Sequence, residues 1–189
     1  MNQRIIITII ALLSVTSCAS KVASLTEDHI KVLDEDVGYL LLGVETNRNL
    51  KGLQISGRQL IEFSHKDLTY GSNFILVDLP AGTYSINQIQ FNKYWRLQIT
   101  NKKYWKFTVQ PGKINYVGHM EIVRKGYWNT STSVELVNRS SEAIDFLEHN
   151  FPTILANRQL TYGGPGEDDF FNFLFPIQAI NANTDEVSE

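Results

Sequence analysis

Histidines are the first candidates for chemistry in this chain, because an imidazole can bind a metal ion or transfer a proton near neutral pH. The four histidines fall in separate regions, at His29, His65, His119 and His149. None stands in an HxH or HExxH spacing, which would bring two ligands to one metal ion. We therefore predict solvated or structural roles for all four. His119 alternates with Met120 in a strand-like run, so we expect it to face away from the core.

The sequence also lacks motifs that are typical of nucleophilic catalysis. The chain contains no G-x-S-x-G turn, no P-loop and no G-x-G-x-x-G, and Cys18 is its single thiol. Residues 167–169, Glu-Asp-Asp, could offer oxygens to Ca²⁺, but they lack the alternating ligand spacing of known calcium loops. We predict a solvated acidic loop there, and we predict no enzyme activity, no catalytic residue, no metal site and no cofactor. The alternative is a hydrolase or metalloenzyme whose residues converge only in three dimensions, for example around His65 or His119 with two carboxylates.

Charge is distributed unevenly along the chain, although the formal net charge is only −3. No Asp or Glu lies between Leu79 and Met120, whereas this stretch holds six basic residues, namely Lys93, Arg96, Lys102, Lys103, Lys106 and Lys113. Such a segment suits an anionic partner, such as lipopolysaccharide, phospholipid head groups or an acidic protein. The alternative is that the lysines only keep a sheet face or edge soluble.

Short alternating runs, separated by Gly, Pro and Asn about every ten residues, predict strands. The expected strands are 38–45, 58–63, 73–79, 82–91, 94–99, 104–109, 114–123 and 132–137. Eight short strands are enough for two packed sheets, so we predict a mainly β fold, an antiparallel two-sheet β-sandwich of transthyretin or immunoglobulin type. A hairpin is expected at residues 79–82 and a β-bulge near Asn87-Gln88, where the apolar parity changes.

The runs 94–99 and 104–109 resemble each other and are predicted to pair. Their alternation places Trp95 and Trp105 toward the core. The candidate binding face consists of the outward residues of these runs and of an exposed loop, namely Tyr94, Arg96, Tyr104, Lys106, Tyr127 and Trp128. The tyrosine-tryptophan pairs could also stack on the sugars of peptidoglycan, although the inward parity of the first two tryptophans argues against this use.

One helix is predicted after the strands, beginning at Ser140 or Ser141 as its cap. Its apolar residues follow the i, i+3, i+4 spacing, so it should pack on a sheet. Residues 152–160 can form a second short helix, 161–169 a loop and 170–177 a buried apolar segment. The segment 170–177 or a free strand edge could alternatively join this chain to other subunits of an assembly.

The N-terminus has the layout of a secretory signal, with Arg4 before an apolar stretch. The apolar segment of residues 5–17 is shorter than the roughly 20 residues that span a bilayer. Val15-Thr16-Ser17-Cys18 resembles the bacterial lipobox, which implies that residues 1–17 are removed and that Cys18 is acylated, for example with palmitate. The alternative is an ordinary signal peptide with Cys18 as a free thiol. Ala19, where an Asp would retain the protein at the inner membrane, implies the outer membrane by the same resemblance.

Two turn motifs, residues 78–84 (DLPAGTY) and 108–118 (TVQPGKINYVG), are similar to a pattern in small envelope lipoproteins of unknown function. The domain of these proteins looks like the transthyretin or carboxypeptidase-regulatory β-sandwich. The resemblance covers about residues 38–123 and implies a fold more than an activity.

The expected organisation is a signal peptide (1–17), a lipidated N-terminus and tether (18–36), a β-sandwich domain with one or two C-terminal helices (37–180) and a disordered acidic tail (181–189). We expect a non-catalytic binding or structural accessory of the bacterial cell envelope. It would be attached to the outer membrane by lipid and would face the periplasm, a compartment that excludes nucleic acid as a partner.

Overall fold

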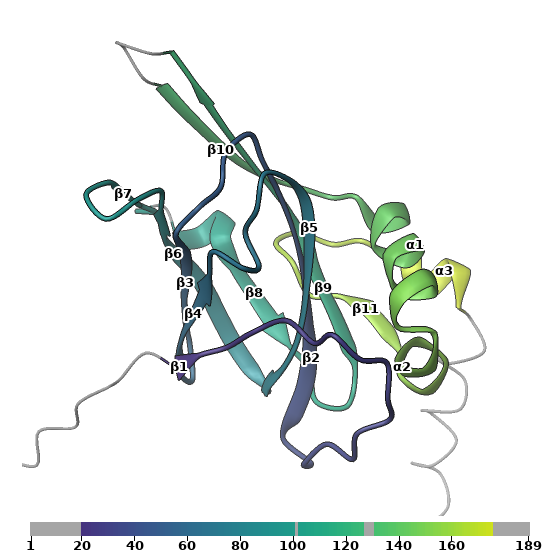
Figure 1. Cartoon of the computed structure of the whole chain (residues 1–189). Helices are drawn as coiled ribbons and strands as arrows, with labels where there is room; N and C mark the ends of the chain where they lie inside the picture. The colour runs from purple at the N-terminus through teal and green to yellow at the C-terminus, as the bar shows by residue number, and fades with distance from the viewer. Residues whose placement is uncertain (1–19, 101, 127–130, 176–189) are drawn as a thin grey trace, which may run out of the picture.

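The computed structural model describes residues 20–100, 102–126 and 131–175. Two β-sheets pack face to face, and a layer of short helices covers one of them (Figure 1). This arrangement confirms the predicted two-sheet β-sandwich with C-terminal helices. The predicted signal peptide, Cys18 and the acidic tail lie outside the described residues.

The first sheet, called sheet A, has six strands in the order β1-β4-β3-β6-β7, with β8 also paired to β6. Their bounds are β1 (Ser20–Lys21), β3 (Gly52–Ser56), β4 (Leu60–Ser64), β6 (Gly82–Gln90), β7 (Arg96–Gln98) and β8 (Lys106–Val109). The second, sheet B, has the order β10-β9-β2-β5, with β11 also paired to β9. Its strands are β2 (Val37–Thr46), β5 (Gly71–Pro80), β9 (Ile114–Lys125), β10 (Ser131–Val137) and β11 (Leu160–Tyr162).

Both sheets are mixed, so the prediction of purely antiparallel sheets is wrong. The pairs β1–β4, β2–β9 and β11–β9 are parallel, and the other pairs are antiparallel. Strand β2 lies in the middle of sheet B, so its neighbouring residues alternate between two buried faces. Leu40 and Leu42 contribute to the core between the sheets, whereas Tyr39 and Leu41 face the helices. This double burial explains why β2 is apolar at nearly every position.

The helical layer consists of α1 (Ser140–Asn150), α2 (Pro152–Asn157) and α3 (Phe170–Leu174). Ala143 and Leu147 of α1 are fully buried against sheet B, which confirms the predicted apolar stripe and its packing. The predicted serine cap is wrong, because Ser140 already belongs to the helix. The side chain of Asn138 takes the capping role, since its Oδ1 accepts hydrogen bonds from the backbone N–H (3.0 Å) and the hydroxyl (2.6 Å) of Ser140.

The predicted bulge in β6 is confirmed. Gln54 of β3 pairs with Gln88, but the next residue, Ile55, pairs with Ile86, so Asn87 is the extra residue. This insertion restores the parity, and the apolar residues on both sides of it face the core. Nδ2 of Asn87 donates a hydrogen bond to Oγ of Ser56 on the neighbouring strand.

Two predicted pairings are wrong. Residues 79–82 do not form a hairpin, because β5 belongs to sheet B and β6 to sheet A, so this turn passes from one sheet to the other. Residues 94–99 and 104–109 do not pair with each other, because β7 and β8 both pair with β6. Residues 104 and 105, predicted as the start of a strand, belong instead to a 3₁₀ turn over residues 102–105. Strands β1, β3 and β11 were not predicted.

Residues 20–36 lie along the domain instead of forming a free tether. Strand β1 pairs with β4 of sheet A, and the backbone N–H of Leu25 then donates to the carbonyl of Leu76 in sheet B at 2.8 Å. Farther along, Asp28 accepts hydrogen bonds from the N–H groups of Thr153 (2.7 Å) and Ile154 (3.0 Å), so it caps α2. Figure 1 shows this segment in purple, crossing from β1 toward α2. It connects the edges of both sheets with the helical layer.

The C-terminal aromatic segment is only partly buried, contrary to the prediction for residues 170–177. Phe171 is buried and contacts Tyr116 edge-on, at 6.1 Å between ring centroids. Phe173 and Leu174 are 82% and 44% exposed, because α3 turns only one of its faces toward sheet B. Residues 176 and 177 lie outside the described part of the chain.

Candidate functional site

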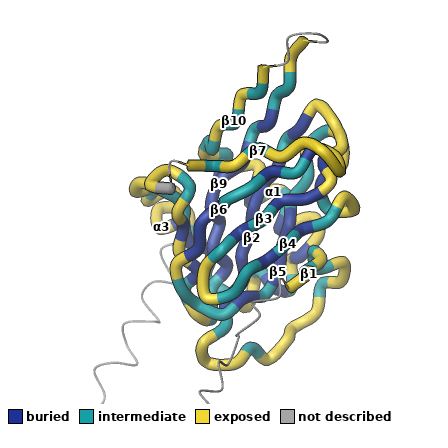
Figure 2. Tube along the Cα trace, turned by 90° about the vertical axis from the view of Figure 1, so that its left-hand side faces the viewer, coloured by how far each residue is buried: buried dark blue, intermediate teal, exposed yellow. Residues whose placement is uncertain are grey.

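The outer face of sheet A is an open, polar surface. Helices cover the outer face of sheet B, whereas half-buried and exposed positions alternate with buried ones along sheet A (Figure 2). The strand registers align a polar row across five strands, because paired residues point to the same side. This row consists of Lys21, Glu62, Gln54, Gln88 and Gln98. Nε2 of Gln98 donates to Oε1 of Gln88 within it.

Arg96 and Lys106 share this outer face, as predicted. Arg96 pairs with Gln90, next to the buried Ile89, and Lys106 pairs with Ser85, next to the buried Tyr84. Both basic side chains are exposed. Their partners on β6 are five residues apart, or about 16 Å at a rise of about 3.3 Å per residue. The two charges therefore form parts of a broad surface and not one compact site.

Tyr94 and Tyr104 are exposed, as predicted for the candidate face, with 81% and 61% of their surface accessible. Asn92 positions the first of them, because its Oδ1 accepts hydrogen bonds from the N–H groups of Tyr94 (2.8 Å) and Trp95 (2.9 Å). The Nζ of Lys93 lies 4.6 Å from the centre of the Tyr94 ring, which adds a cation–π contact. Tyr127 and Trp128, the other predicted contacts, lie outside the described residues.

Trp95 does not occupy the core, contrary to the prediction from its parity. It is 40% exposed, and its ring contacts Phe91 at 5.6 Å between centroids and the guanidinium of Arg124, whose Cζ is 4.2 Å from the Trp95 ring centroid and 5.9 Å from that of Phe91. Arg124 belongs to β9 of sheet B, so this stack joins the end of sheet A to the other sheet. Trp105 is half-buried against the main core, as predicted.

The electrostatics of sheet A favour anions. Among the residues of its six strands, Glu62 is the only acid, whereas Lys21, Arg96 and Lys106 are basic. Additional lysines flank these strands at Lys51 and in the turn after β4. The surface can donate many hydrogen bonds through ammonium and amide groups, which suits phosphate or carboxylate partners.

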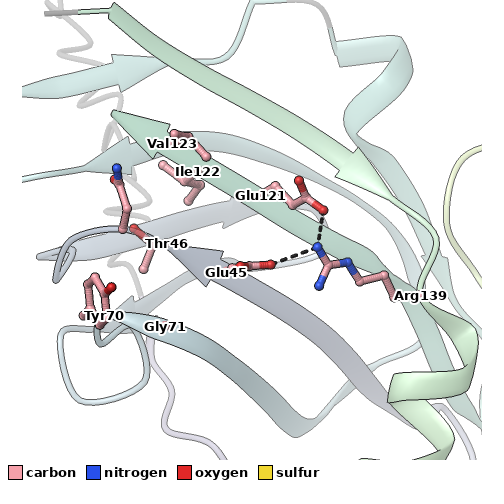
Figure 3. A pocket seen from close by; sticks show the side chains of 9 residues that line it. Glu45, Thr46, Tyr70, Gly71, Glu121, Ile122, Val123 and Arg139 are labelled. Atoms are coloured by element: carbon pink, nitrogen blue, oxygen red, sulfur yellow. Dashed lines mark hydrogen bonds and ion pairs between the residues drawn. The ribbon is translucent and has the colours of Figure 1, made fainter. Parts of the chain in front are cut away.

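A second candidate is the cleft beside Arg139, which has a volume of about 200 Å³ (Figure 3). Nη2 of Arg139 contacts Oε2 of Glu45 at 2.9 Å and also Oε1 of Glu121, and its Nη1 lies 3.4 Å from Oε2 of Glu142. The hydrogen bond to Glu121 raises the pKa of the guanidinium above its ordinary value. This cluster joins two strands of sheet B to the start of α1, a structural role that sequence spacing did not indicate.

His119, predicted to face away from the core, is completely buried. It does face away from Met120, as expected, but the helical layer covers this side of sheet B as well. Its ring meets Phe74 edge-on at 5.3 Å, and neither ring nitrogen has a hydrogen-bond partner among the described residues. Burial, followed by the nearby charge of Arg139, lowers the pKa of His119. The imidazole is therefore neutral at physiological pH.

The lowered pKa of His119 predicts a loss of stability in acid. The unfolded chain binds a proton at this histidine below about pH 6.5, whereas the folded chain binds it only at a lower pH, so the free energy of unfolding must fall as pH decreases between the two pKa values. His119→Leu should remove this contribution, whose upper limit is about 1.4 kcal/mol for each pH unit in this range. Urea unfolding at pH 7.0 and 5.5 measures it, with His65→Leu, at an exposed position, as the control. An unchanged pH dependence in His119→Leu would contradict the prediction.

The loop of residues 167–169 was predicted to be solvated, but Asp168 within it is bonded to the domain. Oδ2 of Asp168 accepts hydrogen bonds from Nδ2 of Asn138 (2.6 Å) and Oγ of Ser140 (3.0 Å), and its Oδ1 accepts from the N–H of Phe170 (2.9 Å). Desolvation acts to raise the pKa of Asp168, but these hydrogen bonds outweigh it and the pKa is lowered. The described residues contain no group of three or more His, Cys, Asp and Glu side chains arranged to hold a metal ion.

Comparison with protein-family models and with curated proteins found no match to this chain. Within the part of the chain that the structure describes, none of the helices is long and apolar enough to cross a membrane.

Proposed function

We propose that this chain is a lipid-anchored lipoprotein of the bacterial envelope that binds an anionic envelope component or an acidic protein, without catalysis, through the outer face of sheet A. The anchor would be the acylated Cys18 in the outer membrane, with the domain in the periplasm. The proposal for the anchor rests on the lipobox-like Val15-Thr16-Ser17-Cys18 and on the short apolar segment before it.

The observation that carries the binding proposal is the open, basic outer face of sheet A. Helices cover the outer side of sheet B, whereas the outer side of sheet A is left open. Arg96 and Lys106 lie exposed on this face, and neither forms an ion pair among the described residues. Unpaired cations on an open sheet retain their full attraction for an anionic partner.

Crosslinking in intact cells tests the binding face. The double variant Arg96→Glu plus Lys106→Glu should lose a specific envelope partner that wild type retains, because the reversal turns attraction into repulsion. A matched control, Arg48→Glu plus Lys125→Glu, reverses two exposed charges outside sheet A and should retain the partner. All chains are compared at equal expression, with acylation of Cys18 confirmed by the mass of the purified protein. Recovery of the same partners with all three chains would show that the basic face only provides solubility.

A second candidate function is a subunit of an envelope assembly. The exposure of Phe173 and Leu174 on α3 favours it, because apolar side chains in contact with water often mark protein interfaces. A hydrolase receives less support from the groove that contains His65, because Glu62 is the only carboxylate among the described residues that line it.

A further inference from the structure

A second basic site lies at the opposite edge of sheet A from β7. A groove of about 430 Å³ opens where β1 meets β4. Its polar lining includes three lysines and one histidine, namely Lys21, Lys51, Lys66 and His65, with Glu62 and Ser64 beside them. Three ammonium groups against the carboxylate of Glu62 give the lining a net charge of +2 before any contribution from the imidazole. Asp67, whose Oδ2 accepts a hydrogen bond from Oγ of Ser64 at 3.1 Å, lowers the local value to +1.

Regular backbone contacts hold these cations in place. Lys21 is paired with Glu62 in the β1–β4 ladder, and the N–H of Lys51 donates to the carbonyl of Gln90 at 2.7 Å. The N–H of Lys66 donates to Oγ of Ser64 at 3.3 Å, within the turn after β4. The lysines therefore come from three separate segments that the sheet fixes relative to one another, while their flexible side chains can adapt to a ligand.

The groove also lies close to the proposed lipid anchor. Strand β1 begins at Ser20, two residues after Cys18, and two extended residues reach at most about 7 Å. Lys21 lies only three residues after Cys18, and the N–H of Val22 donates to the carbonyl of Glu62 at 3.3 Å, which fixes this segment on the domain. An acylated Cys18 would therefore keep the groove next to the lipid head groups of the membrane.

We propose that this groove binds the phosphate of an anionic lipid head group in the membrane that holds the anchor. The inference rests on the proposed acylation of Cys18, and it assigns a partner distinct from that of the Arg96 and Lys106 surface. Ammonium groups converge on phosphate as point charges, and the N–H of an imidazole adds a directional donor. The contact would fix the orientation of the domain on the bilayer. The β1 edge of sheet A would lie nearest to the membrane.

Lysine footprinting tests this contact on the intact lipoprotein. The acylated protein is reconstituted into vesicles of phosphatidylcholine alone or with phosphatidylglycerol, and its lysines are acetylated and quantified by mass spectrometry. Acetylation of Lys21, Lys51 and Lys66 should slow about fivefold in the anionic vesicles, since each lysine near an anionic surface contributes about 1 kcal/mol. Lys103 and Lys125, which are exposed and lie outside the groove, should change little. The inference would be overturned if each of the five lysines were acetylated at the same rate in both kinds of vesicle.

Flotation of a chain that lacks the anchor provides an independent test. The mature chain with Cys18→Ser should bind the phosphatidylglycerol vesicles, and adding Lys21→Gln, Lys51→Gln and Lys66→Gln should weaken this binding about a hundredfold. A control with Arg48→Gln and Lys125→Gln, at exposed positions outside sheet A, should bind as before, and circular dichroism confirms that each variant is folded. Equal binding by the triple variant would overturn the inference. A Cys18 without acyl mass in the native protein would instead contradict the proposed anchor, and the flotation result would still measure the groove.

Discussion

Gly43→Ala should destabilise the fold by about 3 kcal/mol, the upper part of the range for overpacking a buried site. A Cβ added to Gly43 would collide with Nδ1 of His119 and would lie only 2.7 Å from its Cγ. Gly43 and His119 are direct partners in the parallel pair β2–β9, and the register of this pair shifts just before Gly43. The imidazole cannot move aside easily, because Phe74 and the helical layer enclose it.

A double-mutant cycle separates this collision from any general effect of alanine in β2. His119→Ala removes the ring that the new methyl group would meet, so Gly43→Ala should cost much less in that background. Urea unfolding at pH 7.0, where His119 is neutral, gives the four free energies of unfolding. His65→Ala, at an exposed position, provides the matched background and should give no rescue. A cost of Gly43→Ala that is the same in both backgrounds would contradict the predicted contact.

Sequence patterns predicted the individual strands better than their partners. Alternation depends on which face of a strand is buried, so it revealed β6 and even the bulge at Asn87. Strand pairing depends on contacts between residues that are distant in sequence. Turn residues indicate that the chain reverses, but they do not indicate which sheet the next strand belongs to. The Pro80-Ala81-Gly82 turn is an example, since it leads from sheet B to sheet A.

In the candidate site, too, features set by neighbours along one strand could be predicted, whereas features set by strand pairing could not. The outward parity of Arg96 and Lys106 could be predicted, because it depends only on neighbours along each strand. The groove at Lys21, Lys51 and Lys66 could not, because β1 and β3 were not predicted and their pairing with β4 brings these lysines together. His119 was placed on the correct side of its strand, but its burial depends on where α1 packs.

Asn115→Leu should be the second strongly destabilising substitution, with an expected loss of at least about 3 kcal/mol. Asn115 is fully buried, and its Nδ2 donates to the carbonyls of Tyr39 and Gln110, both at 3.0 Å. Its Oδ1 accepts from the N–H of Gln110 at 3.0 Å and from Oγ1 of Thr161 at 3.3 Å. Leucine has a similar volume but would leave these buried backbone groups without partners, at about 1–3 kcal/mol each.

The position of Asn115 explains why these hydrogen bonds are important for the whole fold. They close the turn of residues 110–113, in which Gly112 has a φ of +69°, and this turn carries the chain from β8 in sheet A to β9 in sheet B. The bond to Tyr39 also holds β2 against the start of β9. The side-chain amide of Asn115 therefore holds both the turn that crosses between the sheets and the start of the parallel β2–β9 pair in sheet B.

The control for Asn115→Leu is Asn92→Leu, because the side chain of Asn92 also bonds to the backbone but is exposed. Its Oδ1 accepts hydrogen bonds from two backbone N–H groups. Water can replace those bonds, so the control should lose no more than about 1 kcal/mol. Urea unfolding of both variants measures the difference, and native-state hydrogen exchange shows where it arises. The amide of Gln110 should lose its protection in Asn115→Leu even under conditions in which the domain is folded. Equal losses of stability in the two variants would mean that the turn is held by its own backbone and not by the buried amide.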